Sequence, residues 1–261
     1  MTERQHAKIS KDDRVAILTV DNPPVNMLTF AVVTDLEGAL EELWADDEVK
    51  AIVVTGAGQM VFIAGADINA ILQLNTPAEA KDVVMKVHDL FQRIENSVKP
   101  IIAAVNGHAL GAGIELAMAC HMRIANNRAM IGQPEIGLGI IPGFGGTQRL
   151  ARLVGKGKAL ELILTGDRIT AAEAASIGLV NRAVPGTEVM KTAVGLAKKI
   201  TSFGRPATTA AIEAVNEGLA VSIEKGLEIE ADKFSSLVET EDMREGLTAF
   251  LEKRQPKFQD K

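Results

Sequence analysis

Cysteine is almost absent from the sequence, which has a single one, Cys120, in 261 residues. No disulfide can form within the chain, so its stability has to come from a packed core. Cys120 follows Ala117, Met118 and Ala119, and we interpret it as a small core hydrophobe rather than a reactive thiol. A chain with one cysteine is typical of a reducing compartment, and we therefore expect a cytoplasmic protein.

Aromatic residues and positive charge are also scarce. Aromatics make up 3% of the chain, tyrosine is missing, and the formal net charge is −6. Nucleic-acid binding needs a basic surface, and single-stranded targets also need interleaved aromatics on which bases stack. The composition therefore argues against nucleic acid as the main partner and leaves a small-molecule ligand open.

The sequence lacks segments that would cross or target a membrane. No run of about eighteen apolar residues occurs. Residues 1–14 carry Glu3, Asp12 and Asp13 and have no apolar stretch of the kind that a signal peptide needs. We expect no membrane span. With 47% hydrophobic and 24% charged residues, the chain is typical of a globular protein with one large core.

Three common functional motifs are missing as well. The four histidines have no metal-ligand spacing such as His-Glu-x-x-His, and we expect no metal site. No Gly-x-Ser-x-Gly segment is present, which excludes the usual serine-nucleophile turn. Gly56 and Gly58 follow a strand-like run, but Val61 stands where a dinucleotide-binding fingerprint has its third glycine.

The sequence does contain an alternation of short β-type and helical segments over roughly its first two thirds, followed by helices alone. This order predicts an α/β fold with largely parallel strands. We expect residues 1–198 to form the α/β core with the active site and residues 199–261 to form a helical C-terminal module. The apolar faces of that module are expected to pack on the core or on another subunit. The expected strands are residues 14–20, 50–55, 101–105 and 179–184. The expected helices are residues 29–44, 77–94, 146–154, 156–164, 189–200, 206–219, 222–237 and 241–253, with a further short helix ending at Gly178 and opened by a capping box of Thr170 and Glu173.

Two glycine-bearing turns, residues 65–67 and 111–113, are lined by residues with little side-chain bulk. Small side chains let a ligand reach backbone N–H groups, and a helix that opens near Gly113 adds a partial positive charge. Two such N–H groups converging on one point would form an oxyanion hole. The alternative is that both are ordinary tight turns in a packed fold, with Asp67 as a helix N-cap and His108 as a packed side chain.

Two glutamates, Glu115 and Glu135, lie twenty residues apart among apolar neighbours such as Ile114, Leu116 and Ile136. An ionised carboxylate buried without a partner is costly, so such a group raises its pKa or shares protons. Two carboxyls held close together can bind and activate one water molecule. The structural alternative is a first-turn acid favoured by the helix dipole at Glu115 and a surface acid at Glu135. Spacing alone leaves both interpretations open.

Five segments of the chain together resemble one known family. They are AGADI at 64–68, IIAAVNGHALGAGIELAMAC at 101–120, GQPEIGLGIIPGFGGTQRL at 132–150, LTGDRITAAEA at 164–174 and EGLTAFLEKRQPKF at 245–258. From about Val15 to its C-terminus the chain resembles the crotonase, or enoyl-CoA hydratase/isomerase, superfamily, and most of all a bacterial-type enoyl-CoA hydratase. This resemblance implies a spiral of ββα units with a C-terminal helical oligomerisation module, assembled as a homotrimer or a homohexamer.

The resemblance also implies a reaction. A trans-2-enoyl-CoA thioester would take up water to give a 3-hydroxyacyl-CoA, with coenzyme A as part of the substrate and no separate cofactor. The backbone N–H groups of Ala66 and Ala112 would hold the thioester oxyanion, although Ala112 departs from the glycine frequent at its position. Glu115 would act as the base on the water, and Glu135 would supply the proton to Cα.

Further substrate contacts are implied by the same resemblance. Asn69 stands where a lysine is common in the family, so one phosphate contact is expected to be missing or supplied elsewhere. Phe250 and Lys253 match residues that reach the coenzyme A of a neighbouring subunit. The expected substrate-binding residues are Val25, Met27, Ala64, Asp67, Ile68, Gly111, Gly143, Phe250 and Lys253.

Several functions remain open at this stage. Within the family, the alternatives are a double-bond isomerase and a hydratase of an unusual acyl group, such as an alicyclic or aromatic-pathway intermediate. Outside it, the alternatives are an RNA-binding protein, which the acidic composition opposes, and a non-catalytic scaffold, which retention of both acids opposes. Acyl-chain length and the direction of flux are not readable from the sequence.

Overall fold

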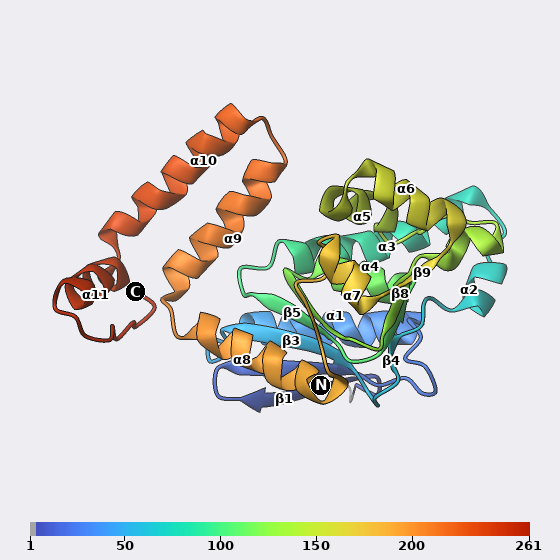
Figure 1. The fold of residues 1–261 in the computed structure, drawn as a ribbon, viewed down its shortest axis with the longest axis horizontal. Helices are drawn as coiled ribbons and strands as arrows, with labels where there is room; N and C mark the ends of the chain where they lie inside the picture. Colours follow the sequence, from blue (N-terminus) through green and yellow to red (C-terminus); the bar gives the residue numbers. More distant parts are fainter. Residues whose placement is uncertain (1–3) are drawn as a thin grey trace.

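The computed structural model describes residues 4–261, which form two β-sheets and a set of surrounding helices (Figure 1). The larger sheet has six strands in the order β1-β2-β3-β5-β7-β10, and the smaller has four in the order β4-β6-β8-β9. The strands of the larger sheet are β1 (Ala7–Asp12), β2 (Val15–Val20), β3 (Ala51–Gly56), β5 (Ile101–Val105), β7 (Met122–Asn126) and β10 (Arg182–Val184). Those of the smaller sheet are β4 (Val61–Ile63), β6 (His108–Leu110), β8 (Met130–Gly132) and β9 (Arg168–Thr170).

The helices cover both faces of the larger sheet and extend beyond it at the C-terminus (Figure 1). They are α1 (Phe30–Ala45), α2 (Ile68–Leu72), α3 (Pro77–Glu95), α4 (Ala112–Ala119), α5 (Gly146–Val154), α6 (Lys156–Thr165), α7 (Ala171–Ser176), α8 (Val189–Thr201), α9 (Arg205–Leu219), α10 (Ile223–Ser236) and α11 (Glu241–Leu251). Three 3-10 helices, η1 (Pro134–Leu138), η2 (Gly186–Glu188) and η3 (Leu237–Glu239), complete the described elements. Each helix expected from the sequence is present, with ends shifted by a few residues.

The chain alternates between the two sheets, and this alternation builds a spiral. β3 is followed by β4, β5 by β6, and β7 by β8, so each long strand of one sheet leads to a three-residue strand of the other. A helical segment follows each pair before the chain returns to the larger sheet. The predicted spiral of ββα units is therefore confirmed. Strands of three residues are too short to show a periodicity, which is why the smaller sheet was not visible in the sequence.

The strands of the larger sheet are parallel, as predicted, except that β1 runs antiparallel to β2. β1 was not expected, because only Ala7 of its six residues is buried and Lys8 and Lys11 break the apolar pattern. Charged residues of this kind protect an edge strand from pairing with other chains. The strand expected at residues 179–184 is shorter than predicted and begins at Arg182, because the Leu179 carbonyl accepts a hydrogen bond from the Arg123 side chain instead of joining a ladder.

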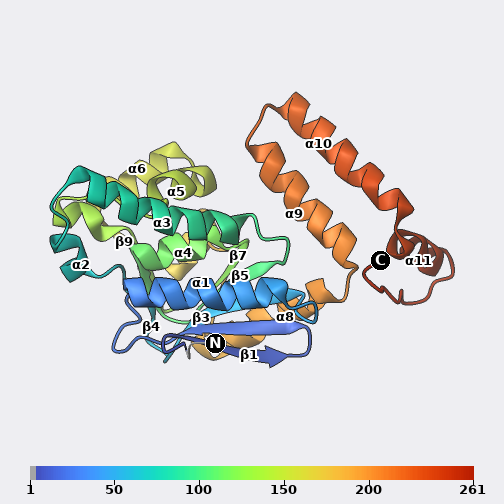
Figure 2. The same ribbon diagram turned by 180° about the vertical axis from the view of Figure 1, so that it is seen from behind.

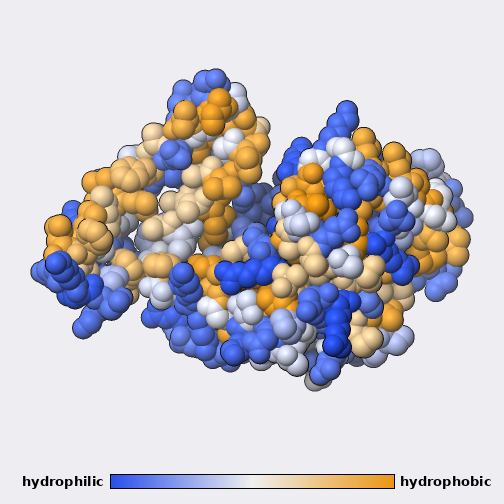
Figure 3. Space-filling model, viewed as in Figure 1, coloured by the Kyte–Doolittle hydropathy of each residue, from blue (hydrophilic) through white to orange (hydrophobic). Residues whose placement is uncertain are grey.

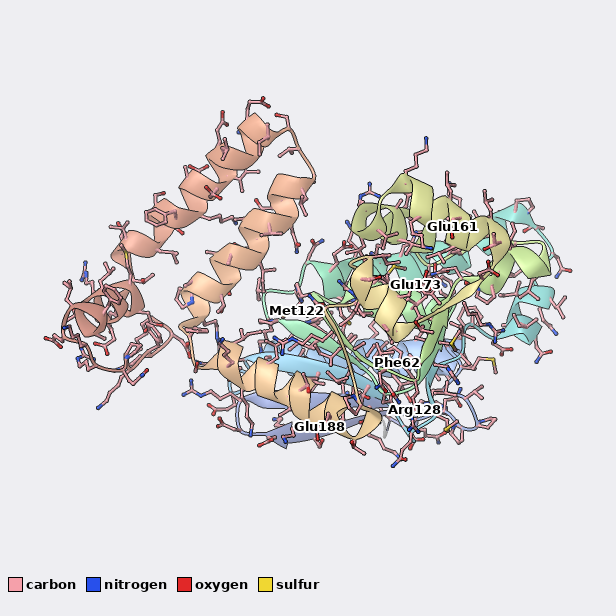
Figure 4. All side chains as sticks on the ribbon, in the orientation of Figure 1. Phe62, Met122, Arg128, Glu161, Glu173 and Glu188 are labelled. Carbon is pink, nitrogen blue, oxygen red and sulfur yellow. The ribbon has the colours of Figure 1, made fainter. Side chains whose placement is uncertain are left out.

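Both faces of the larger sheet are covered, so its central strands read as continuous apolar runs. On one face, Val53 and its neighbours on adjacent strands pack against Val189, Ala193 and Ala197 of α8. On the other face, Ile52 and its neighbours pack against α1 and the smaller sheet. Figure 2 shows α1 lying across this second face, and Figure 1 shows α8 on the first. The smaller sheet, with Phe62 fully buried near the middle of the molecule, is thus fixed against the core (Figure 4).

Helix starts follow the capping residues in the sequence, with one correction. Thr29 and Asp67 cap α1 and α2 through their side-chain oxygens. The reciprocal capping box is formed by Thr76 and Glu79 at α3. Thr170 caps α7, but Glu173 does not complete a box there, because its carboxylate pairs with Lys158 of α6, which also binds Glu161 (Figure 4).

The last helices leave the core as an arm made of α9, α10 and α11 (Figures 1 and 2). The boundary expected at 198/199 falls inside α8, which packs on the larger sheet along its length; the chain turns away only after Thr201. Asp260 near the C-terminus ties the arm to the core, because its carboxylate accepts from Lys50 Nζ at 2.7 Å and from the Arg205 N–H at 2.9 Å.

The arm carries much apolar surface. Figure 3 shows it along α9 and α10, and the most exposed large hydrophobic side chains there are Leu219, Ile223, Phe234, Phe250 and Leu251. Across residues 4–261, no helix combines the length and the apolar character needed to cross a membrane.

Candidate active site

Glu115 lies on α4, a helix whose eight residues are all buried. Its side chain is 1% exposed, and Oε1 accepts backbone hydrogen bonds from Phe144 at 2.8 Å and Gly146 at 2.7 Å. Burial raises the pKa of Glu115 to about 7, an effect strengthened by the charge of Glu135 and opposed by the two N–H donors. A carboxyl that titrates near neutral pH can both take and return a proton under ordinary conditions.

Glu135 approaches the same region from η1. It is half-buried, and burial raises the pKa of its carboxyl. The Glu135 carboxylate packs closely against Gly111. A Cβ added to Gly111 would lie 2.7 Å from Glu135 Oε1 and 3.7 Å from the Cα of Gly65. Gly111 also has φ of +53°, a conformation that favours glycine. Any side chain at Gly111 would therefore displace the Glu135 carboxylate.

Gln133 lies beside Glu135, and the sequence did not single it out. Its side chain is 2% exposed, and when its amide is turned so that the NH2 group faces Glu135, that group lies 3.2 Å from both carboxylate oxygens. The same amide and Glu115 Oε1 both crowd Gly146, where an added Cβ would meet them at 2.7 and 2.8 Å. The signal was present in the sequence as a lone amide residue beside Glu135 in an apolar segment, but amides are also common on surfaces.

The two glycine turns meet beside these acids. A Cβ on Gly65 would lie 3.8 Å from the Leu110 carbonyl, and Gly65 has φ of +123°. Leu28 forms an isolated β-bridge with Ala66. The Leu28 N–H donates to the Gly65 carbonyl, and the Asp67 N–H donates to the Leu28 carbonyl. The Ala66 N–H takes no part in this bridge. Neither the Ala66 nor the Ala112 N–H has an acceptor among residues 4–261. Ala112 is buried and Ala66 is half-buried, and backbone N–H groups without a protein acceptor are the groups that an oxyanion hole needs.

Several predicted substrate-binding residues lie along this turn. The Ala64 N–H donates to the Val25 carbonyl, which places the segment that also contains Met27 alongside residues 64–67. Asp67 uses its carboxylate to cap α2 through the Asn69 N–H. Ile68, the first residue of α2, is partly exposed.

The remaining predicted contacts divide between the site and the arm. The Gly143 carbonyl lies 2.7 Å from His88 Nε2 on α3, next to the residues that bind Glu115. Phe250 is 81% exposed on α11, and Lys253 follows that helix, so within one chain they lie on the arm and apart from the two acids (Figure 1).

Other residues singled out in the sequence take structural roles. Cys120 is buried, and burial raises the pKa of its thiol to about 12, which leaves it unreactive. His108 Nδ1 accepts from the Met130 N–H and so joins two strands of the smaller sheet. Within the described residues, no group of three or more His, Cys, Asp and Glu side chains is arranged to hold a metal ion.

An apolar cavity opens beside the site. Its wall includes Leu28 and Ala66 on one side, Ile71 of α2 and Val87 of α3 on another, and Phe144 next to Glu115. Two acids with raised pKa, two free N–H donors and an apolar cavity thus lie together in one region of the core.

Comparison with known proteins identifies the family to which the chain belongs. Residues 10–261 match the family model described as enoyl-CoA hydratase/isomerase. The chain belongs to the enoyl-CoA hydratase/isomerase family. It is 44% identical over 253 residues to the short-chain-enoyl-CoA hydratase of Clostridium acetobutylicum, with 97% of each chain covered. It is also 44% identical over 251 residues to the crotonyl-CoA hydratase of Syntrophomonas wolfei, with 96% of each chain covered.

Solved structures of the enoyl-CoA hydratase/isomerase family share the fold. The crystal structure of an enoyl-CoA hydratase from Bacillus anthracis superposes with a TM-score of 0.94 at 37% identity, covering 98% of this chain and 100% of the other. The resemblance inferred from five sequence segments is therefore confirmed over nearly the whole chain, both in sequence and in fold.

Proposed function

We propose that this member of the family is an enoyl-CoA hydratase that adds water reversibly to a trans-2-enoyl-CoA. One observation carries the proposal: two carboxyl groups with raised pKa values lie beside two backbone N–H groups that have no protein acceptor among the described residues. The relatives named as short-chain and crotonyl-CoA hydratases support the same reaction. The substrate is an acyl-CoA thioester, and coenzyme A leaves with the product as part of it.

The reaction follows from the positions of these groups. The thioester carbonyl oxygen accepts from the Ala66 and Ala112 N–H groups, which stabilise the negative charge that develops as an enolate forms. Glu115 takes a proton from water as the oxygen bonds to Cβ, and Glu135 gives a proton to Cα. One water is added in total, with oxygen and hydrogen at Cβ and hydrogen at Cα, so the reaction needs no redox cofactor. We also propose that no metal takes part, because the two acids supply the proton transfers.

At the start of the hydration the two acids must be in different protonation states. Glu115 has to be ionised and Glu135 protonated, and because the two groups interact they titrate as a pair. Gln133 donates to Glu135 and so keeps its carboxyl turned toward the site. We expect kcat/KM for hydration to pass through a maximum as pH increases, because the reaction needs one acid ionised and the other protonated, and the two limbs belong to the pair rather than to either residue.

The direct test is a hydration assay. The purified protein is incubated with crotonyl-CoA, and loss of the conjugated enoyl absorbance is followed together with incorporation of ¹⁸O from labelled water into 3-hydroxybutyryl-CoA. Butyryl-CoA, which has no double bond, is the control substrate. The proposal is rejected if neither signal appears with any of the trans-2-enoyl-CoA substrates tested, whatever their chain length.

The family description also names isomerases, and a double-bond isomerase would use the same oxyanion hole. Such an enzyme would convert a 3-enoyl-CoA to the 2-enoyl isomer without taking up ¹⁸O. If that conversion is the faster reaction, isomerisation replaces hydration as the main activity. Hydration of an alicyclic or aromatic-pathway acyl-CoA remains the other alternative and would appear as preference for that substrate in the same assay.

We further propose that the chain assembles into a homotrimer or homohexamer through its arm. The support is the row of exposed apolar side chains on α9, α10 and α11, which is too extensive to remain in water. In such an assembly Phe250 and Lys253 would contact the coenzyme A of a neighbouring subunit. The protein is also proposed to be cytoplasmic, a proposal supported by its single, buried and unpaired cysteine.

A further inference from the structure

The Glu115 carboxylate depends on a short backbone segment, residues 144–146. Both N–H groups that it accepts come from this segment, from Phe144 at 2.8 Å and from Gly146 at 2.7 Å. Residues 139–145 lie between η1 and α5 and belong to no helix or strand. Because no regular ladder of backbone hydrogen bonds fixes the segment, its conformation depends on the side chains that bind it.

Side chains of α3 and α5 bind the carbonyl groups of this segment. The Gly143 carbonyl lies 2.7 Å from His88 Nε2, so that ring nitrogen has to carry a hydrogen. The Phe144 carbonyl accepts from Arg149 Nη1 at 3.2 Å. The guanidinium group lies directly over Gly145, which has φ of +104° and whose added Cβ would lie 2.1 Å from Nη1. The segment is thus held through its carbonyls while its N–H groups hold the catalytic carboxylate.

Arg149 is itself fixed by Glu95, the last residue of α3. Nε and Nη2 of Arg149 donate to Glu95 Oε2 at 3.1 and 2.8 Å, and the Arg149 side chain is only 13% exposed. The Glu95 carbonyl accepts from Asn216 of α9 at 2.7 Å, which fixes the end of α3 in turn. The planar guanidinium binds Glu95 along one edge and leaves Nη1 for the Phe144 carbonyl. A lysine, with one nitrogen, cannot reproduce this fork.

We propose that Arg149 is a positioning residue for the hydration, which keeps residues 144–146 in the conformation that binds ionised Glu115, and that Glu95 holds Arg149 in place for this role. The inference rests on the proposed hydratase function and adds to it a pair of residues that act without touching the substrate. Arg149 acts on Glu115 through the backbone of residues 144–146 and through its positive charge.

The charge of Arg149 gives this role a signature in the pH profile. Burial is the largest influence on the pKa of Glu115 and raises it, whereas the charge of Arg149 lowers it. Without that charge, the low-pH limb of the profile should move to higher pH. Without the Glu95 carboxylate, Arg149 is no longer neutralised, and the limb should move to lower pH. Titratable groups nearby that stay the same in every variant are Glu135 of η1, His88 of α3, His108 of β6, Arg123 of β7, and Cys120 and His121 after α4.

The test measures kcat and KM for crotonyl-CoA against pH in the full-length natural protein and in R149Q, R149K and E95Q. R149Q should lower kcat by about tenfold or more, because the acid is misplaced, and leave KM within a few-fold. Its low-pH limb should move to higher pH. R149K keeps the charge, so its limb should stay near the natural one while kcat still falls. E95Q should lower kcat less than R149Q and move the limb to lower pH.

The control is R152Q on the same helix. Arg152 is exposed and its Nη1 binds Gln148, away from residues 143–146, so kcat, KM and the pH profile should remain natural. Thermal melting reports folding, and R149K and E95Q carry the test if R149Q unfolds. The proposal is overturned if R149Q and R149K keep the natural kcat and pH profile, or if their activity falls only in proportion to the folded fraction. A natural protein that hydrates no enoyl-CoA would reject the hydratase function, and this proposal with it.

Discussion

At the scale of single residues, the site depends on placing acids where water is scarce. Glu115 is the one charged side chain on α4, and two backbone N–H groups bind its carboxylate directly, with a smaller effect from the charge of Arg149. A cationic partner would lower the pKa and remove the basicity that the reaction needs. The structure therefore satisfies the hydrogen-bonding needs of Glu115 while leaving its pKa near 7.

Replacing either acid with its amide should remove hydration without removing substrate binding. We expect E115Q and E135Q each to lower kcat for crotonyl-CoA by about 10²-fold or more, because general acid–base catalysis contributes on that order. Binding of a non-reacting thioester, measured by calorimetry, should stay within a few-fold of the natural value. Full activity in either variant would contradict a two-acid mechanism.

The pKa of Glu115 also makes a prediction about stability. Because burial raises this pKa from 4.5 to about 7, the folded chain binds more protons than the unfolded chain between these values. Stability from this group therefore falls as pH rises from about 4.5 to 7. A glutamine does not ionise, so E115Q does not lose this stability. The unfolding free energy of E115Q minus that of the natural chain should therefore increase by about 3 kcal/mol as pH rises from 4.5 to 8.

Chemical denaturation at the two pH values measures this difference. The control is E230Q, which changes an exposed glutamate on α10 and should follow the natural pH dependence. If the unfolding free energies of E115Q and the natural chain change equally with pH, the pKa of Glu115 is not raised by burial.

At the scale of elements, the position of α4 on the smaller sheet decides where the Ala112 N–H and Glu115 lie. Gly113 makes this contact possible, because an added Cβ would lie 2.2 Å from the Ile63 carbonyl of β4. The helix start and the strand are thus packed backbone to backbone. Neither element alone fixes the positions of the Ala112 N–H and Glu115; their contact does.

We expect G113A to push α4 away from β4. Overpacking of this kind costs about 1–3 kcal/mol of unfolding free energy, and kcat should fall further than stability alone explains, because an oxyanion donor moves. Thermal melting and the crotonyl-CoA assay together measure both effects.

The matched control for G113A is G195A, on an exposed part of α8 where an added Cβ meets nothing within 4 Å. It should raise stability by about 0.5–1 kcal/mol and leave activity unchanged. Equal effects of the two substitutions would show that α4 does not need close contact with β4.

At the scale of the whole molecule, the arm has too little contact with its own core to bury its apolar side chains. α10 has no buried residue, although it packs on α9 where Gly218 and Gly226 allow the helices to approach. The Asp260 contacts hold the arm in a fixed position relative to the larger sheet. A fixed arm with a bare apolar face is suited to contact another copy of the chain.

A charge on that face should reduce assembly. We expect L227D to shift the protein toward monomers in analytical ultracentrifugation, because a carboxylate would be buried without a partner in the contact. E228Q, at the neighbouring exposed position, should sediment like the natural protein. A natural protein that sediments as a monomer at micromolar concentration would contradict the proposed assembly.

The sequence alone predicted the helices, four strands of the larger sheet and the family. Parallel strands such as Ala51–Gly56 appear as continuous apolar runs because both of their faces are covered, and helix starts such as Thr29 and Thr170 are marked by local hydrogen bonds. These signals depend on neighbouring residues, so they can be read along the chain. The segments around Glu115 and Glu135 indicated the family for the same reason, because their motifs consist of residues that are neighbours in the chain.

Only the tertiary structure decided which groups those acids contact. It placed Gln133 against Glu135, brought Gly65 close to Gly111, and put the Phe144 amide on Glu115. In the structure, the strand expected from residue 179 begins only at Arg182, and the Glu173 carboxylate pairs with Lys158 rather than with the start of α7. These contacts join residues far apart in the chain, and their energies depend on burial, which local sequence does not specify.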